Sequence, residues 1–186
     1  MCGRYFIADE AISGFDIELL NRTAGGAEIR PGMEAPVVVA PEGNTLAPMR
    51  WGFERDNGGL VINARVETIG EKPMFRGLAR DQRCAMPATR YFEWRHSDRQ
   101  KFAIDLLGAD LFWLAGLWRV GGAGQEFVVL TQPPVAAIEP VHNRMPLILP
   151  SRNALARWFG GDVPLFSESR AIRLAAEGPE QLRMAF

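Results

Sequence analysis

The chain has 186 residues, of which 47% are hydrophobic and 23% are charged, and its 21 basic and 22 acidic side chains leave a formal net charge of −1. A length of this order suits one domain over residues 1–186, and the composition excludes a disordered chain. The near-zero net charge excludes a histone-like protein that coats nucleic acid through a polybasic surface, although it is compatible with a local basic groove.

Short strands separated by proline and glycine turns dominate the first half of the chain. An opening strand over residues 3–8 is followed by a predicted helix over Asp9–Arg22, in which apolar residues recur at helical spacing until Gly25 and Gly26 end it. The pattern then predicts three strands and a helix around Pro73, namely strands Val37–Ala40, Leu46–Phe53 and Leu60–Ala64 and a helix over residues 71–82.

The second half continues in the same way. A short helix over Arg152–Phe159, with Ser151 as its N-cap, follows the strands, and Glu177–Met184 is a further candidate helix. The predicted strands are Arg83–Met86, Arg90–Arg95, Phe102–Leu106, Leu111–Trp118 and Glu126–Thr131. Together these elements predict an α+β single domain with an antiparallel, barrel-like β core flanked by a few helices.

The expected location is the cytoplasm. No apolar stretch approaches the roughly 18 residues that a membrane span needs, so we expect no membrane partner. A secretory signal is absent, because Asp9 and Glu10 soon follow Arg4 where an apolar core would lie. The two cysteines, Cys2 and Cys84, are too few for a disulfide framework, which favours a reducing compartment.

Positive charge is concentrated in the middle of the chain. Residues 50–101 carry nine arginines and two lysines against seven acidic residues, whereas residues 1–49 carry three arginines against seven. Arginine is the better bidentate partner for phosphate and carboxylate groups. The arginine excess alone does not decide for a nucleic acid, but it marks the segment in which an anion site is expected.

The second residue carries unusual chemistry if Met1 is removed, as a small residue at position 2 favours. Cys2 then offers an α-amine and a thiol, whose unperturbed pKa values are about 7.7–8.0 and about 8.5, so both are partly reactive near neutral pH. The amine can form a Schiff base with an aldehyde, and the thiol can close that imine into a five-membered thiazolidine. Taken alone, a cysteine here could equally be incidental.

Three internal segments supply candidate partners for this chemistry. Asn63 and Arg65 alternate on a predicted strand and so share one face, where an amide can orient a reacting group and a guanidinium can bind phosphate. Glu93 lies among aromatic residues, where burial raises a carboxyl pKa toward the range of general acid/base work. His142 lies in a predicted loop beside Arg144. An exposed strand, an outward Glu93 and a solvated histidine are the plainer interpretations.

Taken in order, these segments resemble the SOS-response-associated peptidase (SRAP) family, whose members covalently capture abasic sites in single-stranded DNA. The shared motifs span residues 1–150: MCGR at the start, WGF at 51–53, INARVET at 62–68, MFR at 74–76, YFEW at 91–94 and HNRMP at 142–146. The resemblance implies one α+β domain with a barrel-like core and a positively charged groove for single-stranded DNA.

The resemblance also implies catalytic roles. Cys2 would form the thiazolidine link to the ring-opened sugar aldehyde, and Asn63 would position Cys2 and the adduct. Glu93 would act as acid/base, and His142 would assist the Schiff-base chemistry. No cofactor and no metal are implied.

The same comparison assigns the DNA contacts. Arg4, Arg65 and Arg144 would hold the phosphates that flank the lesion. Trp51 and Met74 would pack beside the damaged nucleotide, and Trp51 or Trp94 could stack on a base. The expected partner is single-stranded DNA that contains abasic sites, bound by a cytoplasmic monomer that becomes nucleoid-associated on DNA.

Two other functions stay open. A thiol peptidase could use Cys2 as nucleophile with His142 or Glu93 as base, although only Met1 precedes Cys2 and leaves no propeptide to excise. A non-catalytic nucleic-acid-binding module of the same barrel type is the second. A zinc site from the cysteines, His96 and His142 lacks ligand spacing, and Cys84 reads as a buried structural thiol.

Overall fold

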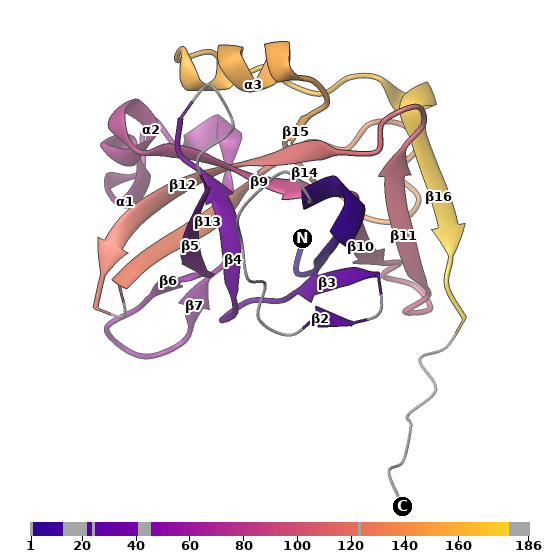
Figure 1. Ribbon diagram of the computed structural model, residues 1–186, viewed down its shortest axis with the longest axis horizontal. Coiled ribbons are helices and arrows are strands. Elements are labelled where there is room, and N and C mark those ends of the chain that lie inside the picture. The colour runs from indigo at the N-terminus through magenta and orange to yellow at the C-terminus, as the bar shows by residue number, and fades with distance from the viewer. Residues whose placement is uncertain (1, 13–21, 24, 41–45, 123, 179–186) are drawn as a thin grey trace, which may run out of the picture.

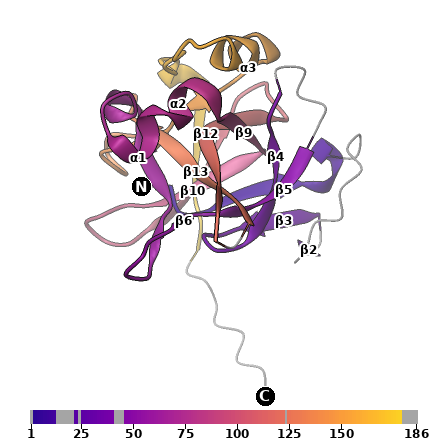
Figure 2. The ribbon, with the colours of Figure 1, turned by 90° about the vertical axis from the view of Figure 1, so that its left-hand side faces the viewer.

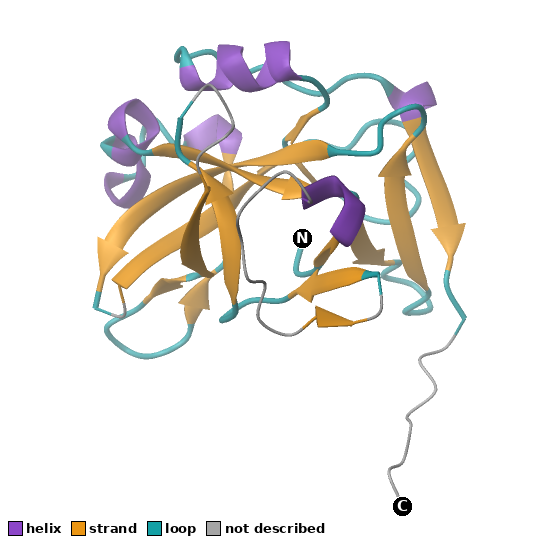
Figure 3. Ribbon diagram, in the orientation of Figure 1, coloured by secondary structure: helices purple, strands orange, loops and turns teal. Residues whose placement is uncertain are grey.

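The computed structural model describes residues 2–12, 22–23, 25–40, 46–122 and 124–178. Strands dominate the described chain, and short helices lie at its periphery (Figure 3). Figure 1 shows the strands β4, β5, β12 and β13 on one side of the molecule and β10, β11 and β16 on the other. The predicted fold class, α+β around a barrel-like β core, is confirmed.

Five strands close into a barrel. Each strand pairs with the next around the ring, and β12 pairs back with β13. The order is β13 (Gly124–Gln132), β5 (Leu46–Trp51), β4 (Glu34–Val38), β9 (Arg83–Ala88) and β12 (Phe112–Gly121). Three short strands extend the sheet: β8 (Asn63–Arg65), β14 (Met145–Pro146) and β15 (Ile148–Leu149). The sheet is not wholly antiparallel as predicted, because the ring strand β5 and the added strand β8 both run parallel to β13.

A second, six-stranded antiparallel sheet packs beside the barrel. Its order is β16 (Ile172–Ala176), β11 (Lys101–Leu106), β10 (Arg90–Trp94), β1 (Tyr5–Ala8), β3 (Gly26–Ile29) and β2 (Arg22–Thr23). The chain reaches Cys2 and Arg4 just before β1, and β1 pairs with β10 through Tyr5 opposite Tyr91. This register brings the amino-terminal residues beside the strand that carries Glu93.

The helices are short. Of the predicted ones, α3 (Arg152–Phe159) is confirmed together with its cap, because the Ser151 side chain accepts a hydrogen bond from the amide of Ala154 at 3.2 Å. The expected helix at 71–82 is instead two single turns, α1 (Pro73–Arg76) and α2 (Leu78–Asp81), which lie at the edge of the barrel (Figure 2). The 3₁₀ turns are η1 (Asp9–Ile12), η2 (Val66–Thr68) and η3 (Ser169–Ala171).

Several predicted boundaries are corrected by the structure. The helix expected over Asp9–Arg22 begins as the 3₁₀ turn η1, and Arg22 belongs to a strand, whereas residues 13–21 lie outside the described chain. The strand expected over Leu46–Phe53 is broken at Gly52, whose φ of +117° suits glycine, and a separate hairpin follows. That hairpin pairs β6 (Phe53–Glu54) with β7 (Leu60–Val61). Most of the candidate helix Glu177–Met184 is not described.

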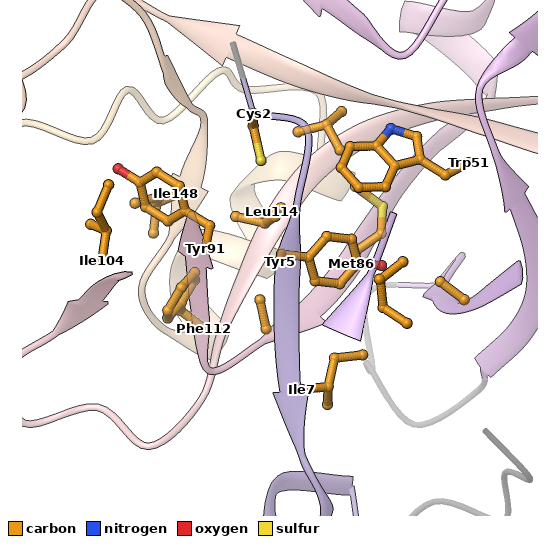
Figure 4. Close-up of a cluster of buried hydrophobic side chains, with 14 of the residues drawn as sticks. Cys2, Tyr5, Ile7, Trp51, Met86, Tyr91, Ile104, Phe112, Leu114 and Ile148 are labelled. Carbon is orange, nitrogen blue, oxygen red and sulfur yellow. The ribbon is translucent and has the colours of Figure 1, made fainter. Parts of the chain in front are cut away.

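The core lies at the junction of barrel and sheet. Figure 4 shows side chains from both, with Trp51 and Met86 from the barrel and Tyr5 and Tyr91 from the six-stranded sheet. Cys2 belongs to the same buried cluster and is fully inaccessible to solvent. The residue with the most distinctive chemistry is therefore fixed where the two sheets meet.

Candidate functional site

The segment from Cys2 to Arg4 is held by one hydrogen bond from the six-stranded sheet and one from the barrel. The amide of Phe92 in β10 donates to the carbonyl of Arg4 at 2.9 Å, which extends the pairing of β1 toward the amino terminus. From the barrel, Asn63 Nδ2 donates to the carbonyl oxygen of Cys2 at 2.9 Å. The structure therefore brings Cys2, Asn63 and the strand of Glu93 together, although 61 positions separate the first two in sequence.

Asn63 is positioned by the barrel beneath it. Its strand β8 runs beside β13, where the amide of Val129 donates to the carbonyl of Ile62 at 3.1 Å. The indole Nε1 of Trp51 donates to the same carbonyl at 2.9 Å. Trp51 itself is 0% exposed and stacks against Phe127, with ring centroids 6.0 Å apart. The structure thus places Trp51 in the core, where it supports Asn63 and has no ring face open to a nucleotide.

Glu93 is a buried carboxyl beside the amino-terminal end of the chain. Only 2% of its surface is exposed, and this burial raises the pKa of Glu93 to about 7, against the lowering effect of the positive amino terminus. At neutral pH such a carboxyl populates both protonation states. It can therefore accept a proton in one step and return it in the next.

The thiol of Cys2 is protonated at neutral pH in this environment. Burial, and next the nearby Glu93 carboxylate, raise the pKa of Cys2 well above its usual value. Burial likewise raises the pKa of the Cys84 thiol. Because the thiolate is the nucleophile of cysteine peptidases, this environment does not activate Cys2 as such enzymes require.

His142 closes a turn that leads into β14. The amide of Arg144 donates to His142 Nδ1 at 3.0 Å. Burial, followed by the charge of the amino terminus, lowers the pKa of His142, which favours the neutral imidazole at pH 7. Because Nδ1 accepts a hydrogen bond from a backbone amide, the proton of the neutral imidazole lies on Nε2.

Arg144 has partners within the protein rather than an open guanidinium. Its Nη2 donates to Glu67 at 2.9 Å and to the carbonyl of Thr131 at 2.6 Å, and its Nη1 donates to the second oxygen of Glu67. The hydrogen bond to Arg144 lowers the pKa of Glu67, so this carboxylate is charged at neutral pH. The predicted phosphate contact of Arg144 would have to compete with Glu67.

Arg65 and Arg4, the other two arginines predicted to bind phosphate, differ in their surroundings. Arg65 is exposed, and within the described chain its side chain makes no hydrogen bond or ion pair. Arg4 lies over the ring of Trp94, 4.9 Å from its centroid, and forms an ion pair with Glu28 at 3.4 Å. Arg65 is therefore the arginine best placed to receive an external anion, and Trp94 carries a cation on its ring.

Two grooves meet at Arg65. One, of about 730 Å³, runs past Asn63 to α1 and is also lined by Arg55, Lys72 and Met74. The other, of about 720 Å³, lies between the β10–β11 turn and the His142 loop and is also lined by Arg95, His96 and Arg144. Met74 is 44% exposed, so its side chain is accessible for the nucleotide contact predicted for it. A chain-like ligand could cross Arg65 and occupy both grooves.

The described residues contain no group of three or more histidine, cysteine or acidic side chains that could hold a metal ion. None of their helices is both long and apolar enough to cross a membrane.

Comparison with known proteins identifies the family. The model of the SOS response associated peptidase (SRAP) family matches residues 1–183. The chain belongs to this family. Among its relatives are the abasic site processing protein YoaM of Bacillus subtilis, 31% identical over 80% of this chain and 75% of that protein, and YedK of Escherichia coli, 28% identical over 72% and 62%.

Solved structures support the same fold for this SRAP protein. A protein of Bordetella bronchiseptica superposes with a TM-score of 0.74 at 19% identity, covering 96% of this chain and 100% of that one. A protein of Bacteroides thetaiotaomicron gives 0.72 at 19% identity, over 94% and 91%.

The sequence did not single out one residue that contacts the candidate site. Glu67 lies inside the INARVET motif, and the available signal was an acidic side chain two positions after Arg65 in the most basic segment of the chain. Its partner Arg144 is 77 positions away, so only the fold reveals the pair.

Proposed function

We propose that this SRAP protein processes abasic sites in DNA and captures the ring-opened sugar aldehyde through Cys2 after removal of Met1. The observation that carries the proposal is the junction at Cys2, where Asn63 binds its carbonyl from the wall of a groove and a carboxyl with a pKa of about 7 adjoins it. Relatives named abasic site processing proteins support the choice of substrate.

The proposed chemistry needs only the groups of Cys2 and one proton carrier. The amine of Cys2 attacks C1 of the aldehyde to give a carbinolamine, which loses water to form an imine. The sulfur then adds to the same carbon, so that a C–S bond forms, the C=N bond becomes C–N, and the proton of the thiol ends on nitrogen. Glu93 can take the proton released in the first step and return it to the departing hydroxyl.

Single-stranded DNA is the form of substrate that suits the grooves. They would follow a flexible strand on both sides of Arg65, with phosphate contacts supplying affinity in a salt-dependent manner. An abasic nucleotide has no base to unstack, so presenting it to the protein costs less than flipping an intact nucleotide.

The test uses an oligonucleotide with one abasic site and an identical intact oligonucleotide. We expect an adduct that survives heat and denaturing electrophoresis without borohydride, formed only with the abasic strand. Its intact mass should equal the protein lacking Met1 plus the oligonucleotide minus one water. An adduct that retains Met1, or none at all, would contradict the proposal, and hydrolysis of peptides under the same conditions would favour the peptidase.

Arg65 offers a prediction about affinity. Replacing Arg65 by alanine should weaken binding to intact single-stranded DNA irrespective of its sequence and flatten the salt dependence, log Kd against log salt, by about one unit. The matched control is Arg80→Ala, because Arg80 is equally exposed but is paired with Asp81. Fluorescence anisotropy over a salt series measures both. Equal behaviour of the two variants would remove Arg65 from the DNA contacts.

A further inference from the structure

A relay of contacts links Glu67 to His142. Glu67 lies in η2, immediately after the β8 strand that presents Asn63, and Arg144 lies immediately before β14. The Glu67 carboxylate holds both terminal nitrogens of Arg144. Arg144 in turn donates its backbone amide to His142 Nδ1 at 3.0 Å.

The last of these contacts defines what His142 can do. A backbone amide is always a donor, so Nδ1 must be the unprotonated nitrogen, and the proton of the neutral ring lies on Nε2. His142 lines the second groove. In this tautomer the second ring nitrogen, Nε2, is a hydrogen-bond donor, which suits an oxygen of a bound ligand.

We propose that Glu67 is a positioning residue, which by binding Arg144 fixes the loop so that His142 keeps its Nε2–H tautomer toward the groove. The tautomer is a property of the protein alone, whereas its effect on reaction rate rests on the proposed function.

The alternative role of Arg144, direct phosphate binding, fits the contacts less well. Its side chain is only 13% exposed, and the carbonyl of Thr131 binds it in addition to Glu67. A phosphate would have to displace a charged carboxylate held by two hydrogen bonds. Arg65, exposed and without such partners in the described chain, is the better phosphate ligand.

The first experiment compares Glu67→Gln with Glu71→Gln by ¹⁵N NMR of histidine-labelled protein without DNA. Both variants lose one negative charge, but Glu71 is exposed and its side chain has no hydrogen bond or ion pair in the described chain. We expect the wild type and Glu71→Gln to show His142 as the Nε2–H tautomer. Glu67→Gln should show a mixture, because the amide has one acceptor oxygen in place of two and so cannot hold the two terminal nitrogens of Arg144 as a bidentate pair.

The second experiment measures single-turnover crosslinking to the abasic oligonucleotide. Removal of a negative charge near phosphate should leave affinity unchanged or improve it in both variants. The rate at saturating DNA should fall only in Glu67→Gln, by about tenfold, a fraction of what general acid/base groups contribute. Arg144→Lys, which keeps the charge but cannot bind a carboxylate with two nitrogens, should reproduce the loss and serves if Glu67→Gln does not fold.

The outcomes are distinguishable. An unchanged His142 tautomer and an unchanged saturating rate in Glu67→Gln, with tighter DNA binding, would overturn the proposal and make Glu67 a competitor for phosphate at Arg144. If wild-type protein forms no adduct, the proposed function fails, and the NMR comparison still decides whether Glu67 positions His142.

Discussion

Replacing Cys2 by alanine is expected to abolish the heat-stable adduct with abasic single-stranded DNA. The variant retains an α-amine after Met1 removal and can still form an imine, but it lacks the sulfur that closes the ring. An imine hydrolyses on denaturation, whereas a thiazolidine carries two single bonds from the former aldehyde carbon. Denaturing electrophoresis separates the two, and borohydride should recover a trapped adduct from the variant.

The matched control is Cys84→Ala. Cys84 is equally buried, but it lies in β9, and the indole of Trp158 binds its backbone carbonyl, which alanine keeps. This variant should form the adduct at the wild-type rate. An uncleavable tag before Met1 should abolish capture although the thiol remains, because the amine is lost. Full yield of heat-stable adduct from Cys2→Ala would exclude the thiazolidine.

Much of the fold follows from local patterns. The strands β9 to β13 alternate or run apolar between turn residues, and the Ser151 cap fixes the start of α3. What could not be predicted depends on contacts between distant segments. The parallel pairing of β5 with β13 closes the barrel, and β16 forms because β11 offers an open edge. In each pair, the sequence of one strand contains no local pattern that identifies the other strand as its partner.

The candidate site likewise has features that the sequence predicts and features that depend on contacts between distant segments. Motif order identifies Cys2, Asn63, Glu93 and His142 as candidates, and the structure gathers the first two through a direct hydrogen bond. The burial of Trp51 and the pairing of Arg144 with Glu67 could not be predicted from the sequence. The aromatic ring of Trp51 suggested a nucleotide contact, but tertiary packing encloses it completely. A residue's type indicates which chemistry it can perform, whereas its neighbours decide whether it faces a ligand.

Replacing Glu93 by glutamine is expected to slow adduct formation by roughly 10²–10⁴-fold, the usual contribution of general acid/base catalysis. Glutamine keeps the shape and hydrogen-bonding capacity of the side chain but cannot carry a proton between the amine and the departing hydroxyl. DNA affinity should be unchanged or slightly higher, because a negative charge is removed. Single-turnover rates and anisotropy separate these two effects.

The pH profile provides the sharper measurement. Burial raises the pKa of Glu93 to about 7, so below pH 7 the wild-type carboxyl becomes protonated and can no longer accept a proton from the amine. As pH decreases, the wild-type rate should therefore fall in two steps, first as the α-amine becomes protonated near pH 8 and then as Glu93 becomes protonated. Glu93→Gln should retain only the ionisation of the amine.

The raised pKa of Glu93 also predicts the stability of the Glu93→Gln variant, which shows whether the variant folds. A carboxyl whose pKa is raised in the folded state destabilises the protein at pH values above that pKa, because its buried form is then charged. It has no such effect at pH values below its pKa in the unfolded chain, where it is protonated in both states. Glu93→Gln should therefore be at least as stable as wild type at pH 8, as measured by thermal unfolding. If this stable variant reacts at the wild-type rate from pH 5 to pH 8, about the range over which the two groups titrate, then Glu93 is structural and the proton carrier is His142 or water.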